Sequence, residues 1–289
     1  VHTSVLVVCA GQAVIALSAP LRAYGLPHVV LERRRIAERW RSCRWSSLVA
    51  NGPAWHDRFP GLDFSEDGPD DFVPKERVAD YLADYASVIE APIRCGVEVK
   101  EVRRNIGRTG FEVETSEGMI EAEAVVAATG PFQIPVIPPL IPPSSDFIQI
   151  HSASYRNPEQ LPEGAVMVVG AGSSGVQIAE ELMRAGRKVY LSVGPHDRPP
   201  RSYRGRDFVW WLGVLNKWDA EATPGVEHTT IAVSGANGGH TVDFRRLAAE
   251  GMTLLGRTET CRAVVLSFAP DPAPYIPRGA RSAARRVGT

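Results

Sequence analysis

The stretch Gly170-Ala171-Gly172-Ser173-Ser174-Gly175 decides the fold class of this chain. It follows the apolar run Ala165 to Val169, which predicts a buried strand, and it precedes Val176 to Ala185, which predicts a helix. In such a unit the first glycine permits a tight turn, the second lets a pyrophosphate approach the backbone, and the third lets helix and strand pack closely. All three glycines are present, so the stretch predicts a dinucleotide-binding loop in preference to a merely tight structural turn.

The segment Lys188 to Val193 predicts the next strand, and its end bears on the choice of nucleotide. An acid there would hydrogen-bond a ribose 2′-hydroxyl and repel a 2′-phosphate, but Ser192 stands at this position. Arginine forks match phosphate oxygens, and an arginine cluster extends from Arg198 to Arg206. The sequence therefore favours NADPH over NADH, with a solvated arginine-rich loop as the alternative. The residues expected to hold NADPH are Gly170, Gly172, Ser173, Ser174, Gly175, Arg198, Arg201 and Arg204.

A related pattern near the N-terminus departs from this motif. Ser4 to Val8 predicts a central parallel strand, a helix follows, and His28 to Leu31 predicts a second strand that ends in Glu32. The loop reads Cys9-Ala10-Gly11-Gln12-Ala13-Val14, so cysteine and valine stand at the first and third glycine positions. Gly11 remains where pyrophosphate approaches, and Glu32 follows about 20 residues later, where a ribose contact is expected. The unit predicts an FAD site that the two substitutions weaken, or else a purely structural strand-turn-helix.

Between these units the apolar spacing in Lys75 to Ile89 predicts an amphipathic helix. Three short segments then predict a β-meander over about 97–121, and Ala124 to Ala128 predicts a buried strand ending at Thr129-Gly130. The expected fold class is α/β, with two Rossmann-like dinucleotide-binding domains of which the FAD domain is incomplete at its C-terminal end. The expected division is an FAD-binding domain over 1–135, a linker over 136–160, an NADP-binding domain over 161–268 and an irregular basic tail over 269–289.

Composition narrows the classes of partner. The formal net charge of -1 over 289 residues gives no electrostatic reason to expect a nucleic acid or an anionic membrane. The apolar stretch Val5 to Leu17 is interrupted by Gly11 and Gln12 and lacks a basic leader, so neither a signal peptide nor a membrane span is expected. The four cysteines are too widely spaced for a redox pair or a zinc site, which favours a cytoplasmic setting. They are Cys9, Cys43, Cys95 and Cys261.

With both loops in place, the chain resembles the flavin-containing monooxygenases and their bacterial flavoprotein relatives. The resemblance rests on a tryptophan-rich segment, on the start of an FAD-domain helix, on an interdomain turn and on the stretch entering the NADP domain. These segments are Trp40-Arg41, Arg44 to Leu48, Asn51-Gly52-Pro53, Asp71 to Pro74, Ala128-Thr129-Gly130, His151-Ser152 and Tyr155-Arg156. The fuller Phe-x-Gly-x-x-x-His fingerprint is absent, since Ser145 and Phe147 occupy its first two positions, and this weakens an assignment to the Baeyer–Villiger subgroup.

The resemblance implies a site and a reaction. Asn51 would lie near the reactive edge of the flavin and offer an amide donor, although the same residue could cap a turn before Gly52-Pro53. NADPH would reduce FAD, and a peroxyflavin would pass one oxygen atom of dioxygen to a small soft-nucleophile or carbonyl substrate. A different FAD/NADP enzyme, such as a disulfide reductase, is the alternative class, but its chemistry would need a paired-cysteine motif that this sequence lacks. The residues implied to bind FAD are Gly11, Gln12, Glu32, Arg33, Trp40, Thr129 and Gly130.

The resemblance extends from about Ser4 to Arg257 and then ends. Members of the family continue further and return to the first domain, whereas Ala269 to Thr289 is rich in Pro, Ala and Arg. We therefore expect a truncated relative that holds FAD poorly and oxygenates little, with a non-catalytic NADP-binding remnant as the alternative. Trp210, Trp211 and Trp218 are expected in a core more often than at a substrate entrance. The sequence does not indicate an oligomeric state.

Overall fold

The strand-helix-strand pattern that the sequence predicts twice is present twice in the computed structural model, which describes residues 2–142, 147–194, 198–221, 232–262 and 265–270. The chain divides into two units by its internal contacts. Unit 1 comprises Val1–Arg44 and Asp57–Pro135, and unit 2 comprises Trp45–His56 and Val136–Thr289. The predicted α/β fold class is confirmed. Ser145 and the part of the expected basic tail from residue 271 onward lie outside the described residues.

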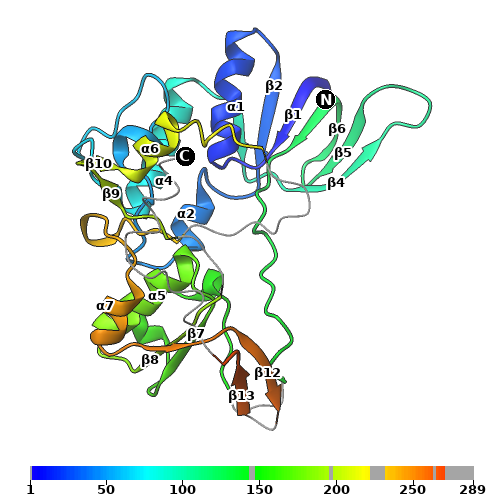
Figure 1. Cartoon of the computed structure of the whole chain (residues 1–289). Helices are drawn as coiled ribbons and strands as arrows, with labels where there is room; N and C mark the ends of the chain where they lie inside the picture. Colours follow the sequence, from blue (N-terminus) through cyan, green and yellow to red (C-terminus); the bar gives the residue numbers. More distant parts are fainter. Residues whose placement is uncertain (1, 143–146, 195–197, 222–231, 263–264, 271–289) are drawn as a thin grey trace. The chain divides into compact units, whose positions relative to one another are not determined.

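Unit 1 is built on one six-stranded sheet (Figure 1). Its order is β3-β2-β1-β6-β5-β4, in which β3, β2, β1 and β6 run parallel while β5 and β4 are antiparallel to their neighbours. The bounds are β1 His2–Val8, β2 His28–Glu32, β3 Ile93–Cys95, β4 Val99–Arg104, β5 Phe111–Thr115 and β6 Gly118–Ala127.

Strand β1 is central because both of its faces are covered. Leu6 packs with Leu31 and Val113 on one face, and Val7 packs with Val14 and Val30 on the other. Neighbouring residues of a strand point to opposite faces, so an unbroken apolar run needs cover on both sides. This burial explains why the run Ser4 to Val8 shows no polar alternation.

Three helices lie within unit 1, namely α1 (Gln12–Ala23), α2 (Glu38–Ser42) and α4 (Lys75–Val88), and the short α3 (Ala54–Asp57) lies where the two units divide the chain. Val14 and Ile15 of α1 are fully buried. The predicted amphipathic helix over residues 75–89 is confirmed, since Tyr81 and Leu82 of α4 are buried and the Tyr81 ring stacks on Phe64 with centroids 4.1 Å apart.

The structure corrects the predicted meander in one respect. The segments around Met119 to Glu121 and Ala124 to Ala128 were expected to be separate strands, but they form the single strand β6. Its first half, Gly118 to Ala122, pairs with antiparallel β5, and Glu121 to Ala127 pairs with parallel β1. The half-exposed alternation therefore changes into a less polar run within one continuous strand.

Unit 2 contains a three-stranded parallel sheet in the order β11-β8-β7. Helix α5 connects β7 to β8 and packs on both strands, and α7 precedes β11. The bounds are β7 Val166–Val169, α5 Ser173–Arg184, β8 Val189–Ser192, α7 Phe244–Ala249 and β11 Thr253–Leu255. The remaining elements are η1 Ser152–Ser154, η2 Pro158–Gln160, β9 Ser202–Tyr203, β10 Arg206–Asp207, α6 Phe208–Val214, η3 Ala236–Gly238, β12 Thr258–Arg262 and β13 Val265–Phe268.

The segment Trp45–His56 belongs to unit 2, although the sequence places it inside the expected 1–135 domain. Trp45 and Leu48 are buried. The Ser46 N–H donates to the Arg156 carbonyl (2.7 Å), and the Ser47 hydroxyl donates to the Glu181 carboxylate (2.6 Å). Unit 1 therefore differs from the expected first domain by this segment, and the division into an FAD and an NADP domain stays a prediction.

Candidate functional site

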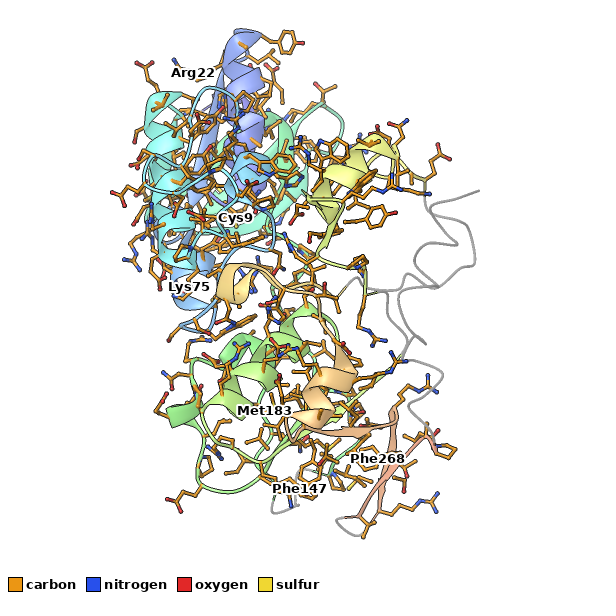
Figure 2. All side chains as sticks on the ribbon, turned by 60° about the vertical axis from the view of Figure 1, so that its left-hand side comes forward. Cys9, Arg22, Lys75, Phe147, Met183 and Phe268 are labelled. Carbon is orange, nitrogen blue, oxygen red and sulfur yellow. The ribbon has the colours of Figure 1, made fainter. Side chains whose placement is uncertain are left out.

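The first loop leaves the carboxyl end of β1 through a left-handed turn at Cys9, labelled in Figure 2. Cys9 has φ +85°, and its N–H donates to the Leu31 carbonyl (2.9 Å). Gly11 is the N-cap of α1, and among the described residues no side chain caps this helix by a hydrogen bond. A Cβ added at Gly11 would meet nothing within 4 Å. The loop thus leaves room and backbone N–H groups for a phosphate.

Several predicted FAD residues meet at one edge of the unit 1 sheet. Strands β2, β1 and β6 are parallel neighbours, so their carboxyl ends lie together. Glu32 ends β2, the loop from Cys9 follows β1, and Thr129-Gly130 comes just after β6. Ligands of open parallel sheets bind outside the carboxyl ends of the strands. Gly130 has φ +80°, a left-handed conformation that suits glycine.

The Glu32 carboxylate is engaged with the backbone of the first loop. One oxygen accepts from the Ala10 N–H (2.8 Å) and the other accepts from the Arg34 N–H (2.8 Å). Each carboxylate oxygen has a second acceptor site, so these bonds leave acceptor capacity for a ribose hydroxyl. The predicted ribose contact of Glu32 stays a prediction.

The other residues expected near FAD have varied surroundings. Gln12 is exposed on the first turn of α1, and Arg33 is exposed with its guanidinium 3.9 Å from the Glu98 carboxylate. Trp40 lies on α2 with the Arg44 guanidinium 5.9 Å from its ring centre. Their roles toward a cofactor stay predictions.

The thiol of Cys9 is not an activated nucleophile. Burial, followed by the charge of Glu32, raises the pKa of the Cys9 thiol above its usual value. A thiol whose pKa is raised is protonated at neutral pH, and the thiolate is the reactive form. All four cysteines lack a disulfide partner.

The second loop repeats the first with glycine at all three positions. Gly170 has φ +96°, and its N–H donates to the Ser192 carbonyl (3.1 Å). A Cβ at Gly175 would lie 1.9 Å from the Gly170 carbonyl oxygen, so only glycine fits this close approach of helix and turn. Gly172 is the N-cap of α5, and within the described residues this helix too has no side-chain cap bond.

The strand register changes the residue that we assign to the nucleotide-selecting position. The sequence predicts Ser192 there, and the register places Val193 there instead. Cys9 donates to Leu31 as Gly170 donates to Ser192, so Ser192 corresponds to Leu31 and Val193 corresponds to Glu32. Val193 is fully buried, and the Ser192 hydroxyl is engaged with Gly256 and Thr258. The position therefore carries valine in place of serine. Neither residue is an acid, so the reason for favouring NADPH over NADH does not change.

The three arginines expected to read a 2′-phosphate have different surroundings. Arg201 is 5% exposed, and its guanidinium donates to Asp207 (2.8 Å) and to the Asn51 carbonyl (2.8 Å). Arg204 is exposed, with its guanidinium 5.3 Å from the Tyr203 ring centre. Arg198 lies over the Phe244 ring at 4.1 Å. Arg204 is therefore open to solvent, whereas Arg201 is engaged in bonds within unit 2, and the binding roles of all three arginines stay predictions.

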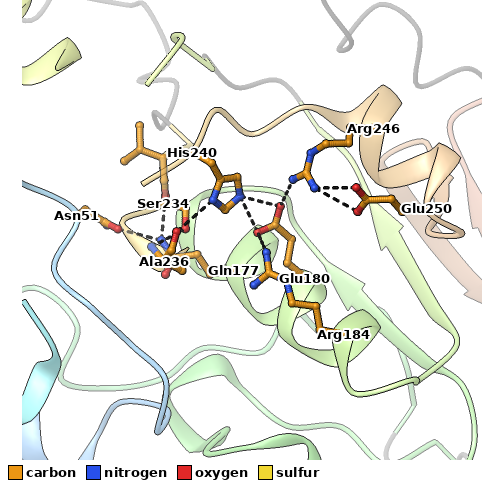
Figure 3. Close-up of polar contacts among 10 residues, drawn as sticks. Asn51, Gln177, Glu180, Arg184, Ser234, Ala236, His240, Arg246 and Glu250 are labelled. Carbon is orange, nitrogen blue, oxygen red and sulfur yellow. Dashed lines mark hydrogen bonds and ion pairs between the residues drawn. The ribbon is translucent and has the colours of Figure 1, made fainter. Parts of the chain in front are cut away.

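Asn51 lies in unit 2, bonded to residues that are far away in the sequence (Figure 3). Its side-chain oxygen accepts from the Gln177 amide at 2.9 Å, and the same Gln177 nitrogen donates to the Val233 carbonyl at 2.8 Å. Ser173, which was expected at the cofactor, accepts the Val233 N–H at 3.1 Å, while Ser174 is exposed. The structure thus connects Asn51 with α5, the helix that begins at the second loop.

Sequence reasoning missed a charged cluster further along α5, also drawn in Figure 3. Glu180 is 1% exposed, and its carboxylate contacts His240 (2.9 Å), Arg246 (3.1 Å) and Arg184 (3.6 Å). The hydrogen bond to Glu180 raises the pKa of His240, although burial opposes the shift. The available signal was Gln177 and Glu180, polar residues on the helix face that also carries Ser173.

Two further observations concern aromatic and histidine side chains that the sequence analysis names. Trp210 and Trp218 are 37% and 54% exposed, so the core interpretation is wrong for both. His151 accepts the Ala153 N–H on Nδ1 (3.1 Å) and caps η1, a local structural role. In the described part of the chain, no group of His, Cys, Asp and Glu could hold a metal ion, and no helix is long and apolar enough to cross a membrane.

Comparisons with known proteins confirm the predicted resemblance. The chain is 42% identical over 218 residues to an uncharacterized CzcO-like oxidoreductase of Geobacillus kaustophilus, covering 73% of this chain and 61% of that protein. It is 30% identical over 191 residues to the indole-3-pyruvate monooxygenase YUCCA1 of Oryza sativa, covering 65% and 47%.

The fold is also similar to that of a solved structure. A flavin-containing monooxygenase from Stenotrophomonas maltophilia superposes with a TM-score of 0.62 at 23% identity, covering 91% of this chain and 80% of that one. The chain spans about three fifths of the length of the first curated relatives it matches. The family model described as pyridine nucleotide-disulphide oxidoreductase matches residues 6–209, and the chain therefore belongs to this family.

Proposed function

We propose that the chain is an FAD- and NADPH-dependent monooxygenase-like oxidoreductase, which transfers one oxygen atom from dioxygen to a small soft-nucleophile or carbonyl substrate. The observation that carries the proposal is the pair of open loops, each following a parallel strand and each preceding a helix whose N-terminus lacks a side-chain cap in the described residues. Two loops of this kind suit two dinucleotides, because the exposed N–H groups and the helix dipole attract a pyrophosphate.

FAD fits the first loop. Gly11 and Gln12 would face the pyrophosphate, Glu32 would accept from the ribose, and Thr129-Gly130 would border the site at the same sheet edge. The open space at Gly11 supports this assignment, since a ligand backbone could approach there without displacing protein atoms. Arg33 and Trp40 complete the residues that we assign to FAD.

NADPH fits the second loop. The residues from Gly170 to Gly175 would hold the pyrophosphate, and Val193 at the end of the strand offers no carboxylate to repel a 2′-phosphate. Arg198 and Arg204 follow in the chain as donors for that phosphate. Arg204→Ala should weaken NADPH binding about tenfold while leaving NADH binding nearly unchanged, as removal of one charge-assisted bond predicts. Equal losses for both nucleotides would exclude Arg204 as the selecting residue.

When bound, the two cofactors supply hydride transfer and oxygen activation, and the protein supplies orientation and an environment poor in water. The four cysteines form no paired motif of the kind that disulfide chemistry uses, and burial raises the pKa of the Cys9 thiol. Asn51 is the residue that we assign to the reaction, as a neutral amide donor toward oxygen atoms that gain charge.

The decisive experiment is an absorption spectrum of the purified chain, followed by titration with FAD and NADPH. We expect NADPH binding with a dissociation constant that responds to Gly172→Val, and a flavin spectrum that stays with the protein after added free FAD has been removed. NADPH consumption coupled to oxygen uptake and to an oxygenated product would then establish the reaction. A chain that binds neither nucleotide would contradict the proposal.

One observation favours a second candidate, an NADP-binding protein that does not retain FAD. Cys9 takes a left-handed conformation that glycine would adopt at lower cost. A colourless chain that binds NADPH and does not take up added FAD would establish this candidate in place of the monooxygenase.

A further inference from the structure

The orientation of the Asn51 side-chain amide follows from a backbone carbonyl, that of Val233, through the Gln177 amide between them. The carbonyl of Val233 can only accept a hydrogen bond, so the Gln177 nitrogen that lies 2.8 Å away must be the NH₂ end of its amide. The same NH₂ group lies 2.9 Å from Asn51, which must therefore present its oxygen to Gln177. The Asn51 NH₂ group is then directed away from Gln177, on a residue that is exposed.

The two partners of Gln177 are themselves held in place. The Val233 N–H donates to the Ser173 hydroxyl (3.1 Å), in the first turn of the helix that follows the second loop. The backbone carbonyl of Asn51 accepts from Arg201 (2.8 Å), whose guanidinium also bonds Asp207. Gln177 is 8% exposed, so water competes little for its amide. The chain of bonds connects the second loop with the Asn51 side chain entirely within unit 2.

We propose that Gln177 is a positioning residue that fixes Asn51 with its amide nitrogen outward, so that Asn51 acts as a hydrogen-bond donor and not as an acceptor. The proposal rests on the proposed function, because it assigns the outward donor to an acceptor oxygen of the cofactors or substrate. A donor held in advance stabilises developing negative charge without reorganisation during the reaction. An Asn51 amide turned by 180° would present its oxygen and repel that charge.

The variant that tests this orientation is Gln177→Glu, which keeps the size of the side chain and removes its NH₂. An ionised carboxylate only accepts, so Asn51 would turn its NH₂ toward residue 177 and its oxygen outward. Gln177→Met removes both hydrogen bonds at similar volume and leaves Asn51 without a fixed orientation. Glu181→Gln is the matched control, since Glu181 lies on the same helix and accepts hydrogen bonds from Ser47 and Tyr155 in place of Asn51.

The first readout is independent of activity. In a chain with ¹⁵N-labelled asparagine, the side-chain NH₂ resonances assigned to Asn51 by their loss in Asn51→Ala should move in Gln177→Glu and Gln177→Met and stay in Glu181→Gln. Unmoved Asn51 resonances in a folded Gln177→Met chain would overturn the proposal. Circular dichroism establishes folding, and Gln177→Asn, which keeps the amide, provides a second folded variant if Gln177→Met unfolds.

The second readout separates positioning from structure. With FAD, NADPH and substrate present, Gln177→Glu should lower kcat by about 10- to 100-fold with a small change in the KM for NADPH, as loss of one oriented donor predicts. The double variant Gln177→Met with Asn51→Ala should be no slower than Asn51→Ala alone, because Gln177 acts through Asn51. Additive losses would overturn the proposal. A wild-type chain without monooxygenase activity would instead contradict the proposed function, while the NMR readout would still decide the orientation of Asn51.

Discussion

The two loops begin with the same left-handed turn but form it with different residues. Cys9 and Gly170 both have positive φ, at +85° and +96°, and both donate to the end of the neighbouring strand. The helices begin at the corresponding glycines, Gly11 and Gly172. The turn geometry is therefore a property of the strand-turn-helix unit, and glycine lowers its cost without being required for it.

The third position shows the opposite behaviour. Gly175 lies so close to the turn that a Cβ would be 1.9 Å from the Gly170 carbonyl oxygen, whereas Val14 carries a branched side chain that is fully buried. The first unit therefore accommodates a branched side chain at this position, and Val14 packs together with Val7 and Val30. The first loop has exchanged a close approach for a packed side chain, and we expect the two loops to respond differently to the same substitutions.

The largest difference should appear with alanine at Gly175 and at Gly11. Gly175→Ala places a methyl group against backbone that cannot move aside, and we expect a loss of about 3 kcal/mol or more in the free energy of unfolding. Gly11 is surrounded by open space and has extended backbone with φ -90°, which alanine also adopts. Gly11→Ala should therefore change stability by less than about 1 kcal/mol. Urea denaturation monitored by tryptophan fluorescence would measure both. A Gly175→Ala chain as stable as wild type would show that the close approach is not maintained in solution.

The next effect concerns ligand affinity and distinguishes the two loops by their nucleotides. Gly172→Val should weaken NADPH binding by about 100-fold, and Gly11→Val should do the same for FAD, because each valine occupies the place of the approaching pyrophosphate. Each variant should leave the other nucleotide's affinity unchanged. Calorimetric titrations with both ligands provide the measurement, and each variant serves as the control for the other. Loss of both nucleotides in one variant would contradict two separate sites.

The sequence predicted the paired units well because their signals are local. Glycines and short apolar runs determine a turn and a buried strand within about ten residues, and His28–Glu32 is a strand with the predicted bounds. Strand β3 was not predicted, since three residues from Ile93 to Cys95 carry no recognisable period. The sequence predicts two strands in place of β6 because the polarity of the residues changes along this strand. The change follows from its neighbours, which only the sheet order reveals.

The candidate site was less predictable because its contacts are distant in sequence. Asn51 and Gln177 are separated by 126 positions, and Arg201 and Asn51 by 150. Arg201 was expected to bind phosphate on the evidence of its type alone, but its partner Asp207 and its burial were not visible in the sequence. The nucleotide-selecting position was assigned one residue too early, since a strand's register follows from its neighbour.

A smaller effect should distinguish the helix behind the second loop from the helix behind the first. His240 bonds Glu180 of α5, with Arg246 and Arg184 also facing that carboxylate, and the bond raises the pKa of His240. A pKa raised in the folded state contributes stability that is complete below the unfolded value of 6.5 and is lost as pH rises through the folded value. We expect a loss of about 1 kcal/mol over this range, as for one hydrogen bond to a charged group.

Hydrogen exchange would measure this loss. Protection factors of the amides in residues 232–240 should fall as pH rises from 6.5 through the raised pKa of His240, while those of α1 in unit 1 should change little. His240→Gln should have low protection at pH 6 and little further change at higher pH. Protection that increases with pH in the wild-type chain would be the opposite pH dependence. It would exclude a stabilising bond between protonated His240 and Glu180.

The smallest effect tests whether the turn of the first loop stores strain. A left-handed φ costs a residue with a Cβ about 1 to 2 kcal/mol, and glycine removes this strain. Glycine also makes the unfolded chain more flexible, which offsets about 0.5 to 1 kcal/mol of the gain in stability. Cys9→Gly should therefore stabilise the chain by about 0.5 to 1 kcal/mol, and Gly170→Cys should destabilise it by about the same amount, since a Cβ at Gly170 meets nothing within 4 Å. The two substitutions exchange the same residue types at similar positive φ in opposite directions, so each is the control for the other.

The relaxed turn should also favour the ligand, so Cys9→Gly should improve FAD affinity about threefold, a factor that corresponds to about 0.7 kcal/mol. Denaturation midpoints and FAD titration give both quantities. A Cys9→Gly chain that loses stability would show that the packing of the thiol against its neighbours outweighs the strain of the turn, and that the first loop has adapted fully to cysteine.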